Sequence, residues 1–191
     1  MTATKMDKKA WREEIRRRKA EYSSDELKAM SANIIEAVKK SERWKAARCV
    51  LLYHALPDEV DTRQWIDEAA KEKKVLLPHV TGETTMELCL YEGEQSLRIG
   101  AYGIMEPHGT AFSNYEEVDL AIVPGMAFDT ACHRLGRGKG YYDRLLPLLK
   151  SAYRMGICFP FQFIGGTLPV TATDIRMDKV VTAHAETAHN G

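Results

Sequence analysis

The pattern of apolar positions begins with two amphipathic helices. Around residues 6–21, only Trp11 and Ile15 are apolar anchors on a densely charged segment. A second helix is expected after Ser23, because Ser23 and Glu26 have the spacing of a capping box. One face of this helix is apolar, formed by Leu27, Met30, Ile34, Ile35 and Val38. Residues 1–45 are therefore predicted to be an N-terminal pair of helices.

Short apolar runs further along the chain predict strands. The continuous runs "RCVLLYH" (48–54), "KVLLPHV" (74–80) and "VDLAIVPG" (118–125) are typical of buried strands. We expect the last of them at the centre of a sheet. The segment "TTMELCLYEG" alternates like a half-exposed strand, and "YRMGICF" and "KVVTAH" complete the set.

The segments between these strands predict the fold class. Asp61 and Gln64 can cap a helix that carries Trp65, Ile66 and Ala69, whereas "AYGIMEPHG" (101–109) is expected to be irregular. Strands that alternate with helices imply parallel pairing, so we predict an α/β fold, a three-layer α/β/α sandwich with a mostly parallel central sheet. We expect a single domain over 1–191, with the α/β core at 48–184 and a frayed tail at 185–191.

Composition and charge exclude several classes of protein. The chain has 191 residues, and its 27 Lys and Arg balance its 27 Asp and Glu, so there is no global excess to hold nucleic acid or an anionic membrane. The four cysteines are widely scattered and are expected to be reduced thiols. The polar start has no signal-peptide core, and no apolar stretch is long enough to cross a bilayer. We expect a cytoplasmic monomer that binds small molecules, with no nucleic-acid or membrane partner.

Candidate chemistry is concentrated in "RLGRGKGYYDRLL" (134–146). Glycines at every second position let the main chain approach a ligand closely, and successive amides can form a nest of N–H donors for an anion. The following residues take on helical periodicity, which adds a helix N-terminus. Residues 134–144 hold four cations and one anion. These features predict a polyphosphate cradle; the alternative is a flexible surface loop with solvated charges.

The common phosphate motifs do not describe this loop. A P-loop needs Ser or Thr after its lysine, but Lys139 is followed by Gly140. A dinucleotide fingerprint needs a third small residue where Tyr141 stands.

The longer stretch "VPGMAFDTACHRLGRGKGYYDRLL" strongly resembles the signature of the 5-formyltetrahydrofolate cyclo-ligase family, also called 5,10-methenyltetrahydrofolate synthetases. The resemblance spans most of the chain, through K-x-x-x-R at Lys8 and Arg12, "LPDEVDT" (56–62), "AYGIMEP" (101–107) and "LPVTATDIRMD" (168–178). It implies an enzyme that uses ATP as a co-substrate, together with Mg²⁺, to cyclise 5-formyltetrahydrofolate.

The resemblance also implies roles for individual residues. Catalytic roles fall on Arg137, Lys139 and Tyr141, and metal binding on Asp143 and Asp174. Substrate contacts fall on His54, Glu59, Tyr102 and Tyr141. The ATP contacts are Lys8, Arg12, Arg134, Leu135, Gly136, Arg137, Gly138, Lys139, Gly140, Tyr141 and Tyr142.

Simpler interpretations of several of these residues stay open. Lys8 and Arg12 also suit a solvated helix face, and Asp143 suits the first turn of a helix. Asp174 fits a turn, and His54 fits a hydrogen-bonded strand end. Of the two tyrosines, Tyr142 is expected on the apolar helix face and Tyr141 nearer the ligand.

Two positions within the signature are unusual. Cys132 stands where the family commonly has glycine, which raises the question of a positive φ there. Pro147 would clash with a continuous helix and predicts a kink or restart. Competing functions are an enzyme resembling phosphosugar isomerases or CoA-transferases, which would need no ATP, and a non-catalytic nucleotide-binding module.

Overall fold

A large β-sheet forms the middle layer of the structure, a computed structural model that describes residues 6–100, 105–183 and 185–188. From edge to edge the strands are β13 (Ala185–Ala188), β12 (Lys179–Thr182), β10 (Tyr153–Ile157), β7 (Leu120–Val123), β1 (Cys49–Leu51), β2 (Lys74–Val80), β3 (Met86–Leu90) and β6 (Ala111–Phe112). The five inner strands from β12 to β2 pair in parallel, and β13, β3 and β6 pair antiparallel at the edges. This confirms the predicted mostly parallel sheet with β7 near its centre.

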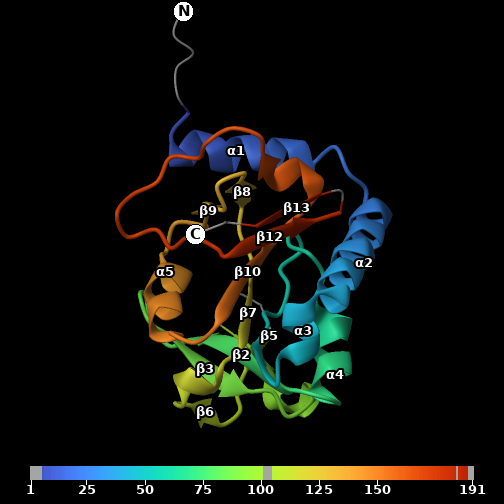
Figure 1. Cartoon of the computed structure of the whole chain (residues 1–191), viewed down its shortest axis with the longest axis vertical. Helices are drawn as coiled ribbons and strands as arrows, with labels where there is room; N and C mark the ends of the chain where they lie inside the picture. The colour runs from blue at the N-terminus through green and yellow to red at the C-terminus, as the bar shows by residue number, and fades with distance from the viewer. Residues whose placement is uncertain (1–5, 101–104, 184, 189–191) are drawn as a thin grey trace, which may run out of the picture.

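Helices cover both faces of the sheet, as Figure 1 shows. One face is covered by α2 (Ser24–Lys40), α3 (Glu42–Ala46) and α4 (Arg63–Ala70), and the other by α5 (Tyr141–Leu145) and the 3-10 turn η3 (Leu146–Leu148). Alternate strand residues enter two separate cores, since Val50 packs with the first set of helices and Leu51 with the second. The three-layer prediction is confirmed.

The first helix, α1 (Lys8–Lys19), lies across the end of the sheet in Figure 1 rather than on either face. Asp7 caps it by accepting a hydrogen bond from the Ala10 N–H at 2.8 Å. The capping box predicted for the second helix is present, with Ser23 and Glu26 bonded reciprocally. The last α-helix, α5, ends before Pro147, and the chain continues as the 3-10 turn η3, as the proline predicts.

Two smaller sheets flank the main one. β8 (Ala127–Asp129) pairs with β9 (Arg134–Leu135) and β11 (Phe163–Ile164), and β4 (Leu97–Ile99) pairs with β5 (Met105–Pro107). Three further 3-10 turns, η1 (Glu94–Ser96), η2 (Tyr115–Glu117) and η4 (Pro160–Gln162), connect these elements. The segment expected to be irregular at 101–109 therefore contains β5, because Met105–Pro107 pairs with the preceding strand.

The turn between β8 and β9 contains Cys132 at φ 62°, so this turn does require the left-handed conformation that glycine adopts more readily. The buried carboxylate of Asp129 stabilises it by accepting hydrogen bonds from the N–H groups of Ala131 and His133. It also accepts one from Leu168, far along the chain. The turn is thus fixed before the chain enters β9 and the glycine loop.

Two local predictions differ from the structure. Thr62, not Asp61, is the N-cap residue of α4 and makes no side-chain cap bond. Asp61 Oδ1 still accepts a hydrogen bond from the N–H of Arg63, the first residue of the helix, at 3.2 Å, and its carboxylate also binds the Arg63 guanidinium. Residues Ala185–Ala188 are not frayed, since their backbone pairs with β12 along its full length. Within the described ranges, no helix is both long and apolar enough to span a membrane.

Candidate functional site

The glycine loop, residues 136–140, connects β9 to α5 and is shaped by its glycines. Gly138 has φ 109° and Gly140 φ 68°, values that L side chains rarely adopt. A Cβ at Gly136 would stand 3.1 Å from Arg134 Nη1, a close contact that the Arg134 side chain would have to relieve by shifting slightly. The loop is therefore conformationally specified, unlike a freely moving surface segment.

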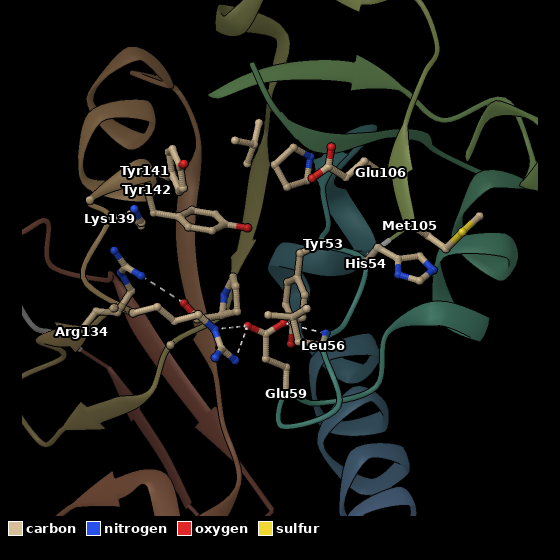
Figure 2. A pocket seen from close by; sticks show the side chains of 17 residues that line it. Tyr53, His54, Leu56, Glu59, Met105, Glu106, Arg134, Lys139, Tyr141 and Tyr142 are labelled. Atoms are coloured by element: carbon tan, nitrogen blue, oxygen red, sulfur yellow. Dashed lines mark hydrogen bonds and ion pairs between the residues drawn. The ribbon is translucent and has the colours of Figure 1, made fainter. Parts of the chain in front are cut away.

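Two cavities adjoin this loop, and Gly136 and Gly140 line both. We call the cavity that contains Lys8 and Asp174 the polar cavity, and the one that contains Tyr53 and Glu59 the apolar cavity. The polar cavity has a volume of about 700 Å³ and the apolar one about 180 Å³. The polar cavity is lined by Lys8, Arg12, Leu135, Gly136, Gly138, Gly140, Asp143, Arg144, Pro147, Thr171, Thr173, Asp174 and Ile175. The apolar cavity, shown in Figure 2, is lined by Tyr53, His54, Leu56, Glu59, Pro78, Val80, Met105, Glu106, Pro124, Gly125, Arg134, Gly136, Arg137, Lys139, Gly140, Tyr141 and Tyr142.

Helix α1 supplies two cations to the polar cavity. Arg12 Nε donates to the Gly136 carbonyl at 2.8 Å. Lys8 Nζ forms an ion pair with Asp174, 166 residues away. Because the two residues are one turn apart, they reach the polar cavity from the same side of α1. Neither is on a fully solvated helix face, so the simpler interpretation of this pair does not describe the structure.

Two carboxylates face the same cavity. Asp143 Oδ1 accepts hydrogen bonds from Arg134 Nη2 at 3.0 Å and from the Ile175 N–H at 3.2 Å. Asp174 Oδ2 accepts from Lys8 and from the Thr171 N–H. Burial alone would raise the pKa of Asp174, but these hydrogen bonds outweigh it and the pKa lies below its ordinary value. Asp174 is therefore a carboxylate at neutral pH and more than a turn residue.

The same contacts test whether these acids suit a divalent cation. The hydrogen bonds described above go to Asp143 Oδ1 and Asp174 Oδ2, so they do not use the second oxygen of either group. No cluster of three or more acidic, histidine or cysteine side chains occurs in the described part of the chain. The arrangement suits Mg²⁺, which is held by one or two carboxylates plus phosphate oxygens and water.

Arg134 lies between the two cavities. It is 6% exposed, it bonds Asp143 on the polar side, and its Nη1 donates to the Pro124 carbonyl at the end of β7. Its guanidinium carbon lies 5.3 Å from the centre of the Tyr142 ring. Arg134 Nε is buried and has no hydrogen-bond partner within the described ranges. A buried cation with an unused donor is costly in a site that stays empty.

On the apolar side, an ion pair joins the loop after β1 to the glycine loop. Glu59 Oε1 accepts from Arg137 Nη2 at 3.1 Å and from Nε at 3.2 Å, and Glu59 Oε2 accepts from the Leu56 N–H at 3.0 Å. Figure 2 shows these bonds at the base of the cavity. Burial raises the pKa of Glu59, although the Leu56 N–H and Arg137 oppose the shift. The Arg137 side chain thus points to the apolar cavity, whereas the sequence placed it nearest the triphosphate.

The aromatic and imidazole groups of this cavity are held by their surroundings. Tyr141 donates from its hydroxyl to the Gly82 carbonyl at 3.1 Å. Tyr142 packs partly on the core, as expected, but its ring also projects into the cavity in Figure 2. Burial raises the pKa of the Tyr142 phenol, so its hydroxyl stays protonated. Burial and the nearby Arg63 lower the pKa of His54, which favours the neutral imidazole.

The structure brings most predicted residues together and adds others. Tyr102 lies outside the described residues, and every other predicted site residue lines one of the two cavities. Sequence reasoning missed Tyr53, Met105 and Glu106, which line the apolar cavity. Met105 and Glu106 stand in the "AYGIMEP" segment, whose resemblance to the family's substrate segment was a usable signal. Tyr53 is hidden in an apolar strand run and gave none.

Comparison with known proteins adds an independent line of observation. A model described as the 5-formyltetrahydrofolate cyclo-ligase family matches residues 4–183. A probable 5-formyltetrahydrofolate cyclo-ligase of Schizosaccharomyces pombe is 35% identical over 173 residues, covering 82% of this chain and 85% of its own. The probable enzyme of the same name from Caenorhabditis elegans is 27% identical and covers 95% of both chains.

Solved structures agree in fold. The NMR structure of Aquifex aeolicus 5,10-methenyltetrahydrofolate synthetase superposes with a TM-score of 0.86 at 36% identity, covering 97% of this chain and 94% of that one.

A relative from Arabidopsis thaliana, 29% identical over 151 residues, is named mitochondrial. The cytoplasmic location expected from the sequence therefore stays a prediction.

Proposed function

Because the chain belongs to the 5-formyltetrahydrofolate cyclo-ligase family, we propose that it uses ATP to cyclise 5-formyltetrahydrofolate to 5,10-methenyltetrahydrofolate, releasing ADP and phosphate. One observation carries this proposal: two chemically different cavities share the main chain of the glycine loop. Transfer of a phosphoryl group from a polyphosphate to a flat organic substrate needs two sites of this kind next to each other.

The polar cavity is proposed to hold the triphosphate. Main-chain N–H groups of residues 136–140 precede the first turn of α5, and nests of this kind favour anions. Arg12 bonds the glycine loop from α1, Lys8 lines the same cavity beside Asp174, and Arg144 lines it from α5. Phosphoryl transfer depends mainly on positioning and charge neutralisation, which these groups supply.

Asp143 and Asp174 are proposed to hold Mg²⁺ through their second oxygens. The ion would neutralise charge on the transferring phosphate. Lys8 and Arg134 then keep both carboxylates oriented toward the cavity.

The apolar cavity is proposed to hold the folate. The buried Glu59 carboxylate suits the amino and ring N–H donors of a pterin. Tyr142 and Tyr53 line the same space and provide flat apolar surface. Neutral His54 can accept or donate one hydrogen bond at the strand end. The resemblance of the "AYGIMEP" segment to the family also implies a substrate contact for Tyr102, which remains part of the proposal.

The chemistry follows from the poor leaving ability of an amide oxygen. Transfer of the terminal phosphoryl group of ATP to the N5-formyl oxygen releases ADP and makes that oxygen part of a phosphate. The N10 amine then attacks the formyl carbon, N10 loses its proton, and the C–O bond breaks with release of inorganic phosphate. A C–N bond has formed, and the positive charge is shared by N5 and N10.

Four residues at the shared wall are proposed to act on the reacting groups. Arg134 is buried between the cavities with an unused Nε donor, so it can stabilise charge at the formyl oxygen. Lys139 and Arg137 extend from the glycine loop into the apolar cavity. Tyr141, bonded to Gly82, closes the wall between the loop and the β2–β3 turn.

The decisive experiment supplies purified protein with 5-formyltetrahydrofolate, ATP and MgCl₂. We expect methenyl-folate absorbance to grow in step with ADP release. Absence of ADP release that depends on the folate would favour an enzyme of the isomerase or transferase type, which needs no ATP. Nucleotide binding without any absorbance change would favour a non-catalytic module, and either result would overturn the proposal.

A further inference from the structure

Arg137 is held by two neighbouring carboxylates, of which only one lines the apolar cavity. Its Nη2 donates to Asp58 Oδ1 at 2.5 Å and to Glu59 Oε1 at 3.1 Å. Glu59 lines the apolar cavity with Arg137. Asp58 instead lines a separate hollow beside Ile15 and Arg16 of α1. The two acids thus reach one guanidinium from different sides.

The two acids also differ in how deeply they are buried. The Glu59 side chain is 9% exposed and that of Asp58 is 28% exposed. Burial raises the pKa of Glu59. The buried acid is positioned to meet a ligand, and the more exposed one is not.

The hydrogen bonds at Glu59 leave too little room for a pterin beside Arg137. Each carboxylate oxygen accepts about two hydrogen bonds. Both acceptor positions of Oε1 are taken by Arg137, through Nε and Nη2. Oε2 accepts from Leu56 and keeps one position. A ligand that donates one N–H to each oxygen must therefore displace Arg137 from at least one bond.

From this competition, which rests on the proposed function, we propose that Asp58 is a positioning residue for Arg137. When the pterin takes Glu59, Asp58 retains the guanidinium at the wall of the cavity. The side chain then stays beside the reacting formyl group instead of turning to solvent. Substrate binding and placement of a loop cation are linked by this exchange of partners.

The test begins with Asp58→Asn, which keeps the shape and removes the charge. We expect kcat to fall about 10-fold to 100-fold, the loss typical of a misplaced catalytic group. The KM for 5-formyltetrahydrofolate should change less than about twofold, because Asp58 does not touch the substrate. Asp61→Asn is the matched control, since Asp61 also binds an arginine in the same loop but lies outside both cavities.

A spectroscopic readout separates positioning from general stability. The ¹⁵N signal of Arg137 Nε, identified by its loss in Arg137→Lys, should remain protected from solvent exchange when 5-formyltetrahydrofolate is added to the wild-type protein. In Asp58→Asn it should lose protection only after the folate is added. A signal that behaves the same in both proteins would overturn the inference.

A double-mutant cycle gives the last test. Asp58→Asn should cost much less in an Arg137→Lys background, whereas Asp61→Asn should be additive with that change. Additivity of Asp58→Asn, or a loss of folate affinity as large as that of Glu59→Gln, would contradict a positioning role. A wild-type protein that forms no methenyl product would instead overturn the proposed function itself, so the two failures are distinguishable.

Discussion

The two cavities beside the glycine loop hold charge in different ways. The polar cavity is lined by cations from α1 and α5 beside two aspartates, one of which pairs with Lys8. In the apolar cavity, burial changes the pKa values of Glu59 and His54, although Arg137 and Lys139 there are exposed. Arg134 belongs to both, because it lines the apolar cavity and bonds Asp143 of the polar one. Loss of one buried group should therefore cost more than loss of one peripheral cation.

The largest effect is expected at the boundary between the cavities. Arg134→Met leaves Asp143 without its buried partner and removes a donor at the shared wall. We expect a loss of about 3–5 kcal/mol in the free energy of unfolding. We also expect a 10²–10³-fold lower kcat, as when a donor to a developing oxyanion is removed. Denaturant unfolding and steady-state kinetics measure the two effects.

Arg154→Met is the control for this change. Arg154 also pairs with a single aspartate, Asp178, but both side chains are about one-third exposed. Its loss should cost about 1 kcal/mol or less. An equal loss in the free energy of unfolding for the two substitutions would show that the position of Arg134 between the cavities does not make its ion pair more important.

Glu59→Gln should weaken folate binding about 10-fold to 100-fold, which is what loss of charged hydrogen bonds costs. Nucleotide affinity should change little, because Glu59 lies only in the apolar cavity. Since burial raises the pKa of Glu59, the group gains a proton and loses its charge as the pH falls through that raised value. Folate affinity of the wild type should weaken in the same direction. Calorimetric titration across pH checks this; an equally steep dependence in Glu59→Gln would assign it to another group.

Gly138→Ala tests the polar cavity through its backbone. Gly138 has φ 109°, and a residue with a side chain adopts this backbone conformation only at a cost of about 1–2 kcal/mol. We expect ATP affinity to fall about tenfold with folate affinity unchanged. Gly165→Ala is the matched control, since a Cβ there would meet no atom within 4 Å. A loop that moved freely would tolerate both substitutions equally, contrary to this expectation.

The smallest effect is expected from Lys8→Met. The ammonium is 27% exposed and shares its charge with Asp174. Removing such a group weakens an anion site by about two- to fivefold, as for a partly solvated pair. The KM for ATP is the measurement, and Lys9→Met, on the neighbouring face of α1, is the comparison. A loss larger than that of Gly138→Ala would reverse the proposed ranking.

The sequence predicts the fold through its strongest local signals. The apolar runs at 48–54, 74–80 and 118–125 contain β1, β2 and β7, because a strand buried on both faces needs continuous apolar residues. Asp61 lies one residue before the N-cap Thr62, and its carboxylate is shared between the N–H and the guanidinium of Arg63, which the spacing of Asp61 and Gln64 does not predict. The strand at Ala185–Ala188 was missed because its pairing with β12 is tertiary and leaves little pattern in a short polar segment.

Prediction of the site from the sequence is also limited to features with a local signal. The glycine loop has a local signal, since residues that need positive φ and neighbouring cations are adjacent in sequence. Asp58 and Tyr53 gave no signal, because their partners come from distant segments or lie within an apolar run. The sequence also could not divide the cradle residues between two cavities. That division depends on where α1 and the loop at 56–59 pack against the glycine loop.

The ion pair between Lys8 and Asp174 has a consequence for synthesis of the protein. One partner leaves the ribosome 166 residues after the other, so a nascent chain can extend from β1 through β10 while the polar cavity still lacks the wall that contains Asp174. If this cavity holds ATP as proposed, nucleotide should bind more weakly to chains that have not yet been translated past Asp174.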